Sequence, residues 1–564
     1  MENSNILKDL VIDNFRKYGD KVAFVEAENG SKKFKEITYS DLRNDILALG
    51  TVMYKNEKLR NQKIAVIGEN SSKWLITYMA VICGVGVIVP LDKQLPEGEV
   101  VNLASRAKIK MIVYSNKKKE LIDSIKEKLP KDIEYVKMYK DEENSISIDD
   151  MIAEGKDLIN KGNYEYIQRK INPDSFAALI FTSGTSSKSK GVMLSNRNIM
   201  SDLNSIYGAY KDVMTRRFLS FLPMHHTYEF TITYLAQLGS GGSIAISRGL
   251  RYLMDDFKET RPEGMCVVPL LLENIKKKIE KTIKKEGKEN TVKNISAVTS
   301  IFGSAKVDIR RKLFSKIHEV FGGRLKYILC GAAAMEKDTA KYMENLGFIL
   351  LQGYGLTEAS PLVSGTTSQN KAFGTVGKAI PNVEVRIDIT DKEENTGEII
   401  VKGENVMLGY FEDEEETKKV LKKGWLYTGD LGKFDEKGNL VITGRCKNVI
   451  VTSNGKNIYP EEIENFIDKI PLVSESMVYG YEEENGSITL AARVTLNEEY
   501  IDETYKESRP SDEEIHNMIW EEIKNINHKL VSYKSVKKLE IKKTDFVKTT
   551  TLKIKRQEEL KNKI

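Results

Sequence analysis

Short apolar runs alternate with amphipathic stretches through the first two-thirds of the chain. Three of these runs cover residues 63–68, 110–114 and 242–246, and each contains at least two Ile or Val residues. Runs of this length and composition are typical of buried strands, and the stretches between them are long enough to form helices. The pattern predicts parallel βαβ units and therefore an α/β fold.

The pattern changes near Gly374, where the apolar runs become shorter and turns become more frequent. A β-rich subdomain is predicted over about residues 374–444, with short runs at residues 383–387, 397–401 and 438–442. The rest of the chain, residues 445–564, is long enough for a separate small α+β domain. We therefore expect an N-terminal domain over residues 1–444, followed by a second domain.

Residues 74–91 form a run of 18 without a charged side chain, which is the lower limit for a transmembrane helix. Gly84 and Gly86 interrupt this run, and the β-branched residues 87–89 follow them. A helix, a turn and a strand within an α/β core fit these features better than a membrane span does.

A strongly basic helix is predicted over residues 275–288. Ile275, Ile279 and Ile283 recur at a spacing of four, so they share one face, and the rest of the surface is cationic. This pattern favours a surface helix that packs on the protein through its isoleucines. Contact with an anionic membrane surface is the alternative interpretation.

The composition excludes several classes of protein. A chain of 564 residues is too long for one compact core, and its net charge of +5 predicts no nucleic-acid partner. The four cysteines lack the spacing of a zinc site or a disulfide framework, and the N-terminus lacks the regions of a signal peptide. These features predict a cytoplasmic protein, with peripheral contact at the inner face of the membrane as the alternative.

The segment 182–191 follows the apolar run 176–181 and combines glycines, hydroxyl side chains and two lysines with no acidic residue. Glycines allow close approach of the backbone, whose N–H groups bind anions together with hydroxyl and ammonium groups. The segment lacks the Gly-Lys-Ser/Thr sequence of a Walker A loop. It therefore predicts a polyphosphate-binding loop of another type, and a flexible Ser-rich surface loop is the alternative.

Two further turns carry carboxylates. Residues 353–358 follow the apolar run 348–351 and end in Glu358, which predicts a ligand for Mg²⁺ beside the phosphate loop. Tyr354 in the same turn predicts stacking on a base. Asp430 lies on another glycine turn, where its carboxylate can accept hydrogen bonds from ribose hydroxyls.

In their order along the chain, these motifs resemble those of the acyl-adenylate-forming superfamily, which contains acyl-CoA synthetases, luciferases and the adenylation domains of peptide synthetases. Residues 182–191 resemble its phosphate loop, and residues 352–358 its adenine and Mg²⁺ motif. Residues 331–333 resemble its turn against the adenine face, and residues 427–430 its ribose motif.

The resemblance continues to the end of the chain. Residues 444–447 match the hinge motif of the family, and residues 454–464 match its next block. Lys553 aligns with the catalytic lysine, and Arg556 follows it as in the family. The resemblance implies a large N-terminal domain of two α/β subdomains plus a β-rich subdomain, and a small mobile α+β C-terminal domain that carries this lysine.

The resemblance also implies three ligands, ATP, Mg²⁺ and CoA. The implied catalytic residues are Lys553, Glu358, Thr185 and His226, and the implied metal ligands are Glu358 and Thr185. His226 would close the acyl pocket, although a core histidine is an equal interpretation. The implied nucleotide- and cofactor-binding residues are Thr182, Ser183, Gly184, Thr185, Ser186, Lys190, Gly331, Ala332, Ala333, Gln352, Gly353, Tyr354, Gly355, Thr357, Asp430, Arg445, Lys447 and Lys553.

The implied reaction is activation of an acid by ATP, followed by transfer to the CoA thiol. Residues 222–229 and 321–325 resemble blocks of long-chain acyl-CoA synthetases, which favours a medium- or long-chain fatty acid as substrate. An acyl–carrier-protein synthetase and an aryl-CoA ligase are alternatives with the same chemistry. A non-catalytic membrane-associated protein is the alternative from another class.

Three departures from the family pattern affect loops of the site. Ser187 stands where the family has Gly, Ser189 where it has Pro, and Leu552 where it has the Gly before the catalytic lysine. Gly allows backbone conformations that Ser rarely adopts, and Pro fixes φ where Ser does not. We therefore expect the phosphate loop to be less tightly preformed than in relatives.

Overall fold

The computed structural model describes most of the chain in atomic detail. The described residues are 4–27, 33–141, 145–182, 189–285, 287, 307–333, 335–391, 395–451, 457–483, 488–506, 508–548 and 554–561. The chain divides into two compact units. The first comprises Met1–Gly184, Lys188–Val385 and Val401–Leu426, and the second comprises Thr185–Ser187, Arg386–Ile400 and Tyr427–Ile564.

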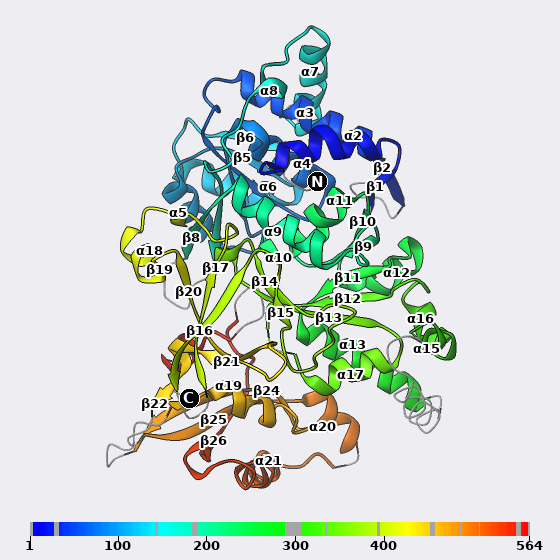
Figure 1. Cartoon of the computed structure of the whole chain (residues 1–564). Coiled ribbons are helices and arrows are strands. Elements are labelled where there is room, and N and C mark those ends of the chain that lie inside the picture. The colour runs from blue at the N-terminus through cyan, green and yellow to red at the C-terminus, as the bar shows by residue number, and fades with distance from the viewer. Residues whose placement is uncertain are drawn as a thin grey trace. The chain divides into compact units, whose positions relative to one another are not determined.

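The first unit contains two large sheets (Figure 1). The seven-stranded sheet has the order β18-β8-β7-β4-β3-β5-β6. Its core pairs, β4 with β3, β3 with β5 and β5 with β6, are parallel, as the βαβ pattern predicts. Its strands are β3 (Lys63–Ile67), β4 (Val87–Leu91), β5 (Ile109–Tyr114), β6 (Glu134–Lys137), β7 (Phe176–Thr182), β8 (Lys190–Ser195) and β18 (Gly409–Tyr410).

The nine-stranded sheet has the order β15-β14-β13-β12-β11-β9-β10-β1-β2. Strands β12 and β13 are parallel neighbours, and β13 turns back into the antiparallel β14. Its strands are β1 (Val22–Ala27), β2 (Phe34–Thr38), β9 (Arg217–Ser220), β10 (Ser243–Ile246), β11 (Gly264–Val267), β12 (Tyr327–Cys330), β13 (Ile349–Gly355), β14 (Leu362–Gly365) and β15 (Lys378–Ala379).

Amphipathic helices connect these strands, in the stretches where the sequence predicts them. The longer helices of the first unit are α3 (Tyr39–Lys55), α4 (Ser72–Ala80), α5 (Glu97–Ala107), α7 (Ile148–Asn160), α9 (Asn196–Ala209), α12 (Leu253–Thr260), α13 (Pro269–Lys285) and α17 (Lys337–Asn345).

The uncharged run 74–91 forms a helix, a turn and a strand, as predicted. Helix α4 begins after Ser71, whose hydroxyl accepts a hydrogen bond from the backbone of Trp74. A π-helical turn follows and includes Gly84, whose φ of 144° few other residues adopt. The run then enters β4, which is buried along its whole length. Within the part of the chain that the structure describes, no helix is both long and apolar enough to cross a membrane.

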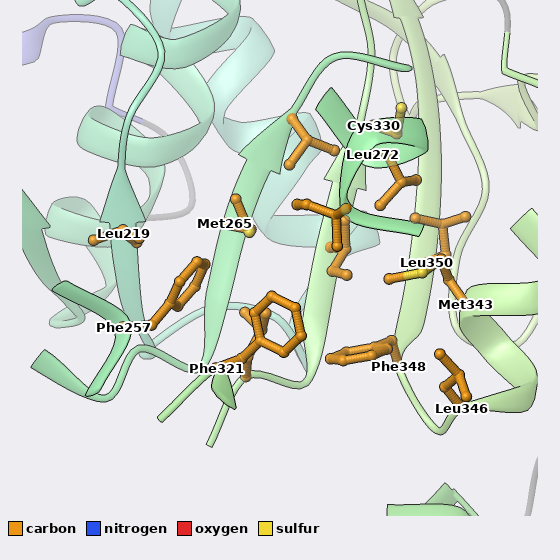
Figure 2. Close-up of a cluster of buried hydrophobic side chains, with 14 of the residues drawn as sticks. Leu219, Phe257, Met265, Leu272, Phe321, Cys330, Met343, Leu346, Phe348 and Leu350 are labelled. Atoms are coloured by element: carbon orange, nitrogen blue, oxygen red, sulfur yellow. The ribbon is translucent and has the colours of Figure 1, made fainter. Parts of the chain in front are cut away.

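Helix α13 packs on the core through the isoleucine face that the sequence predicts. Ile275 and Ile279 are buried in the core beneath the nine-stranded sheet, and Ile283 is half-buried against it. Figure 2 shows part of this core, in which the rings of Phe257, Phe321 and Phe348 follow one another. Because the core already covers the apolar face, the interpretation of a docked surface helix is confirmed.

The predicted β-rich region forms a five-stranded sheet. Its order is β16-β17-β20-β19, and β21 pairs with β20. The three short runs of the sequence fall on β16, β17 and β21. The strands are β16 (Glu384–Asp391), β17 (Thr396–Lys402), β19 (Leu421–Lys422), β20 (Trp425–Phe434) and β21 (Leu440–Arg445).

The C-terminal part of the second unit is a small α+β domain with its own core. A three-stranded sheet, in the order β24-β25-β26, packs with helices through a cluster rich in isoleucine. The elements are α19 (Pro460–Ile467), β24 (Val473–Glu482), β25 (Ile488–Leu496), α21 (Asp512–Asn527) and β26 (Val536–Lys542). Two capping features, Pro460 at the start of α19 and the Ser511–Glu514 capping box of α21, explain where these helices begin.

Candidate active site

Glu358 lies in a short 3₁₀ turn (Thr357–Ala359) just after the carboxyl end of β13. The turn is tight because the chain reverses at Gly355, where a β-carbon would lie 2.1 Å from the carbonyl oxygen of Pro361. The backbone of Met407 donates to the carbonyl of Glu358 at 2.9 Å. The Tyr410 hydroxyl donates to Oε1 of the Glu358 carboxylate, also at 2.9 Å. The predicted metal ligand is therefore held by a neutral donor.

The phosphate loop connects two antiparallel strands, β7 and β8, which are paired from Phe176 with Ser195 to Thr182 with Lys190. Thr182 and Lys190 thus lie opposite each other at the base of the loop. The predicted residues Ser183, Gly184, Thr185 and Ser186 lie outside the described residues, as does Ser187.

The Lys190 side chain has two partners in the first unit. Its ammonium group lies 2.6 Å from a carboxylate oxygen of Glu416 and 4.7 Å from the ring centre of Tyr410. Hydrogen bonds from Lys190, and then from Lys419, hold the pKa of Glu416 down to about 2, so Glu416 is a carboxylate at neutral pH. Lys190 and Glu358 therefore share Tyr410 as a common neighbour.

Ser189, which stands where the family has proline, is anchored to helix α5. Its hydroxyl donates to Glu99 at 3.0 Å, and its carbonyl accepts a hydrogen bond from Arg106 at 2.9 Å. The end of the loop next to β8 is thus fixed by side-chain contacts in place of a proline ring.

The turn at residues 331–333 follows β12, at the carboxyl edge of the same sheet as β13. Gly331 is buried against the Tyr228 ring, which a β-carbon at this position would approach to 3.1 Å. The Tyr228 hydroxyl donates to the Leu329 carbonyl at 2.8 Å and so fixes the ring. Ala332 adopts a left-handed conformation with a φ of 71°, and both alanines are exposed. Their place against an adenine stays a prediction.

The motif at residues 352–357 runs along β13 into the Glu358 turn. The side chains of Gln352 and Tyr354 are largely buried, and the backbone of Gln352 donates to Thr366 at 2.8 Å. The Thr357 hydroxyl lies 3.3 Å from that of Thr227, which belongs to the segment after His226. Gly353 pairs with Gly365 across β13 and β14. Stacking of Tyr354 on a base stays a prediction.

Two histidines and a buried carboxyl lie in the 222–229 block. The ring centres of His225 and His226 are 4.0 Å apart, and Nε2 of His225 lies 3.4 Å from an oxygen of Asp92. Burial, and then the neighbouring His226, hold the pKa of His225 well below its usual range. A cavity of about 10 Å³ lies beside His225, Thr227 and Ser360, and the role of His226 at an acyl pocket stays a prediction.

Glu229, at the end of this block, is fully buried. It accepts hydrogen bonds from the Ser220 hydroxyl at 2.8 Å and from the Thr233 hydroxyl at 3.1 Å. Burial raises the pKa of Glu229 to about 8 despite these two donors, so the carboxyl is mostly protonated at neutral pH.

In the second unit, Asp430 and Arg445 form an ion pair with 2.9 Å between Oδ1 and Nε. The two residues are register partners in β20 and β21. Asp430 is 7% exposed and Arg445 is 44% exposed, so the guanidinium can reach further partners. The preceding Gly429 has a φ of 72°, and its backbone donates to Glu398 at 2.8 Å, which shapes the turn that carries Asp430.

Lys447, the last residue of the predicted hinge motif, lies in a short 3₁₀ turn (Cys446–Asn448) between two anchored positions. Arg445 before it is bound to Asp430. Asn448 after it donates to Glu461 at 2.6 Å. The segment between the anchors is therefore only two residues long.

The predicted catalytic residue Lys553 lies outside the described residues, and so does Leu552. The residues on either side of them make contacts within the second unit. Lys548 and Ile554 form an antiparallel bridge, and the backbone of Lys555 donates to Val547 at 2.8 Å. Arg556 donates to Glu464 at 2.6 Å and to the carbonyl of Val478 at 3.0 Å.

Comparison with protein families identifies the chain. The sequence model of the AMP-binding enzyme family matches residues 12–411, and that of the AMP-binding enzyme C-terminal domain matches residues 447–562. The chain belongs to the AMP-binding enzyme family. It is an adenylate-forming ligase of the acyl-CoA synthetase superfamily, which confirms the resemblance drawn from its motifs.

Several curated relatives of this AMP-binding enzyme share about a quarter of its residues. Long chain acyl-CoA synthetase 4 of Arabidopsis thaliana is 27% identical over 80% of this chain and 72% of its own length. Long-chain-fatty-acid–CoA ligase 5 of Rattus norvegicus is 28% identical over 80% of this chain and 70% of its own length. A chloroplastic long-chain-fatty-acid–[acyl-carrier-protein] ligase of Arabidopsis thaliana is 26% identical over 92% of this chain and 79% of its own length.

Solved structures share the fold. ATP-bound MatB from Rhodopseudomonas palustris superimposes with a TM-score of 0.75 and 22% identity, over 99% of this chain and 98% of its own. The anthranilate CoA ligase AuaEII, in complex with anthranoyl-AMP, superimposes with a TM-score of 0.76 and 16% identity, over 99% of this chain and 98% of its own. The predicted fold class, a large N-terminal α/β part followed by a small C-terminal domain, is confirmed.

The residues of this AMP-binding enzyme fit a magnesium ion that is bound mainly by the nucleotide. No group of three or more His, Cys, Asp or Glu side chains that could hold a metal occurs among the residues that the structure describes. Mg²⁺ commonly binds through one or two carboxylates together with substrate phosphates. Glu358, with one oxygen on a neutral donor, suits this mode of binding.

Two neighbours of Glu358 and Lys190, Tyr410 and Glu416, were not among the site residues predicted from the sequence. Tyr410 is 52 residues from Glu358 along the chain, and Glu416 is 226 residues from Lys190. They reach the site because β18 pairs with β8, with Tyr410 opposite Val192. A strand of two residues leaves no periodic signal, so the local pattern could not have found them.

Proposed function

We propose that this enzyme activates a medium- or long-chain fatty acid with ATP, forms acyl-AMP with release of pyrophosphate, and transfers the acyl group to the thiol of CoA. The observation that carries the proposal is the cluster of Glu358, Tyr410 and Lys190, which combines a carboxylate for a cation with an ammonium group at the base of the phosphate loop. The names of the curated relatives support a fatty acid as substrate.

The first half-reaction brings two anions together, because the fatty carboxylate attacks an α-phosphorus that is surrounded by negative oxygens. Its barrier is largely electrostatic. Lys553 would offset the repulsion between the two anions and stabilise the charge that develops on the equatorial oxygens. Lys190 and the loop before it would bind the departing pyrophosphate.

Glu358 and Thr185 would hold Mg²⁺, which when bound neutralises charge on the phosphate oxygens. Asp430 and Arg445 would fix the ribose and so orient the α-phosphorus for in-line attack. Ala332 and Ala333 would lie against the adenine. Each of these roles follows the family motif that the residue matches.

The second half-reaction needs a different surface next to the adenylate. We infer that the C-terminal domain turns at Lys447, which withdraws Lys553 and admits the pantetheine thiol. The anchors at Arg445 and Asn448 support this role, because they leave two residues to absorb the change in torsion. Hinges commonly consist of a few such residues.

Two alternatives use the same adenylate chemistry. An acyl carrier protein could replace CoA as acceptor, as the name of the chloroplastic relative indicates for that protein. An aryl acid could replace the fatty acid, as in the anthranilate CoA ligase of similar fold. Transfer of a radiolabelled acyl group to free CoA and, separately, to carrier protein distinguishes the acceptors. The cysteine content supports a cytoplasmic enzyme.

The substitution Lys553→Ala tests the division of labour between the half-reactions. We expect the rate of acyl-AMP formation to fall on the order of 10²–10³-fold, because the charge between the two anions is lost. Thioester formation from supplied acyl-AMP should stay close to the wild-type rate. Equal failure of both half-reactions would show that Lys553 does not have this role.

A further inference from the structure

Tyr410 is the neighbour that Glu358 and Lys190 share. Its hydroxyl donates to Oε1 of Glu358 at 2.9 Å, and its ring centre lies 4.7 Å from the Lys190 ammonium group. The side chain is only 7% exposed. The ladder between β18 and β8, and a hydrogen bond of 2.9 Å from the backbone of Tyr410 to Thr417, hold its position. Tyr410 is thus fixed by its backbone independently of the two groups that it contacts.

The hydrogen bond from Tyr410 brings no charged group to Glu358. A phenol is a neutral donor, and burial, together with the nearby Glu358 carboxylate, raises the pKa of Tyr410 further above its usual value. One oxygen of Glu358 is oriented by the hydroxyl, which leaves the second oxygen for a cation. Metal-binding carboxylates are commonly oriented by such hydrogen bonds.

Glu416 forms an ion pair with the ammonium group of Lys190. The two charges lie 2.6 Å apart, and Glu416 also pairs with Lys419 at 2.5 Å. Asp413 caps the helix that carries Glu416, α18 (Glu414–Val420), by accepting a hydrogen bond from the backbone of Glu416 at 3.1 Å. The carboxylate therefore sits on a capped helix, and a polyphosphate that binds Lys190 has to compete with it.

We propose that Tyr410 and Glu416 are positioning residues for the magnesium-bound nucleotide: Tyr410 orients Glu358 toward the cation, and Glu416 holds Lys190 until a polyphosphate replaces it. This inference rests on the proposed function, since it assumes that ATP binds at this cluster. The two residues have opposite effects on the affinity for the nucleotide. Tyr410 favours binding of the magnesium-bound nucleotide, and Glu416 opposes binding of its phosphates.

The first test measures binding of a non-hydrolysable ATP analogue by calorimetry, with and without Mg²⁺ at constant ionic strength. For Tyr410→Phe we expect the Kd with Mg²⁺ to rise about tenfold. The Kd without Mg²⁺ should change by less than about twofold, because the phenyl ring still faces Lys190. The matched control is Tyr207→Phe, which removes a hydroxyl that donates to the Leu235 carbonyl at 3.2 Å. It should change neither Kd.

The second test uses Glu416→Gln, which removes the competing charge and keeps the size of the side chain. We expect the analogue to bind about threefold more tightly both with and without Mg²⁺, because the pair is partly exposed and contributes modestly. Glu415→Gln is the matched control, since it removes the same charge from an exposed position on the same helix. It should leave the Kd unchanged.

The outcomes separate this inference from the proposed function. Equal weakening of both Kd values by Tyr410→Phe, or unchanged or weaker binding in Glu416→Gln, would overturn the inference. If Tyr410→Phe does not fold, as judged by thermal denaturation, Glu416→Gln decides alone. Binding as expected, without any acid-dependent release of pyrophosphate by the wild-type enzyme, would support the inference and contradict the proposed fatty-acid activation.

Discussion

Glu358 and Asp430 are both carboxylates on glycine turns, but they have partners of different charge. Glu358 accepts a hydrogen bond from the neutral Tyr410 hydroxyl, so its negative charge is not compensated by this partner. Asp430 is paired with the Arg445 guanidinium at 2.9 Å. A carboxylate whose partner is a neutral hydroxyl suits a divalent cation, and one that is paired with a guanidinium suits the neutral hydroxyls of a ribose. The partner of each carboxylate thus matches the ligand proposed for it.

Glu229 shows what happens to a carboxyl that has hydroxyl partners and no access to solvent. Ser220 and Thr233 both donate to it, and burial still raises its pKa to about 8. Hydroxyl donors alone therefore do not keep a buried carboxyl charged. Glu358 also has a hydroxyl partner, but its side chain is only half-buried, whereas Glu229 is fully buried.

Among the changes that test this comparison, Glu358→Gln is expected to have the largest effect on the rate of adenylate formation. The substitution removes the charge and keeps the shape, so we expect the rate of adenylate formation to fall on the order of 10²–10³-fold. Added Mg²⁺ should not restore it. The measurement is acid-dependent release of pyrophosphate as a function of Mg²⁺ concentration, with Glu415→Gln as the control for loss of one charge. A loss below about threefold would mean that Glu358 does not act through the cation.

A smaller effect is expected from Asp430→Asn. The asparagine can still bond to a hydroxyl, but Arg445 loses its carboxylate partner, so we expect the KM for ATP to rise about tenfold with a smaller change in kcat. Initial rates at varied ATP and varied acid provide the measurement. The KM for the acid is the internal control and should stay within about twofold. A fall in kcat as large as that of Glu358→Gln would remove the distinction between the two carboxylates.

The smallest effect is a shift in the pH dependence of stability. The pKa of Glu229 is raised from an ordinary 4.5 to about 8 in the folded protein, so between these values the folded state binds more protons than the unfolded state. Stability due to this group is therefore present at low pH and is lost as pH rises through that window. In Glu229→Gln the side chain has no carboxyl group to ionise. The Tm of this variant should therefore fall by a few degrees less than the Tm of the wild type as the pH is raised to about 8. Parallel Tm curves would contradict the assignment of a protonated Glu229.

The sequence predicts the fold better than the partners within the site. Strands such as Lys63–Ile67 and Ser243–Ile246 are apolar runs whose burial depends on the local sequence, so the pattern finds them. Isoleucine spacing likewise finds the buried face of α13. Asp430 and Arg445 each lie in a recognisable motif, and the structure pairs the two residues.

Tyr410 and Glu416 could not be predicted, because their contacts depend on tertiary structure. The Glu358–Tyr410 hydrogen bond exists because the chain returns to pair β18 with β8 long after the phosphate loop. The pKa of Glu229 depends in the same way on packing from several segments. Local propensity carries no information on either.

The most direct test of the proposed function is release of pyrophosphate by the purified enzyme with ATP and Mg²⁺, across straight-chain acids from acetate to stearate and a few aryl acids. We predict that release depends on the acid and is fastest with medium- or long-chain fatty acids. Faster release with aryl acids would contradict the assignment of a fatty acid, and no acid-dependent release with any of them would contradict fatty-acid activation itself.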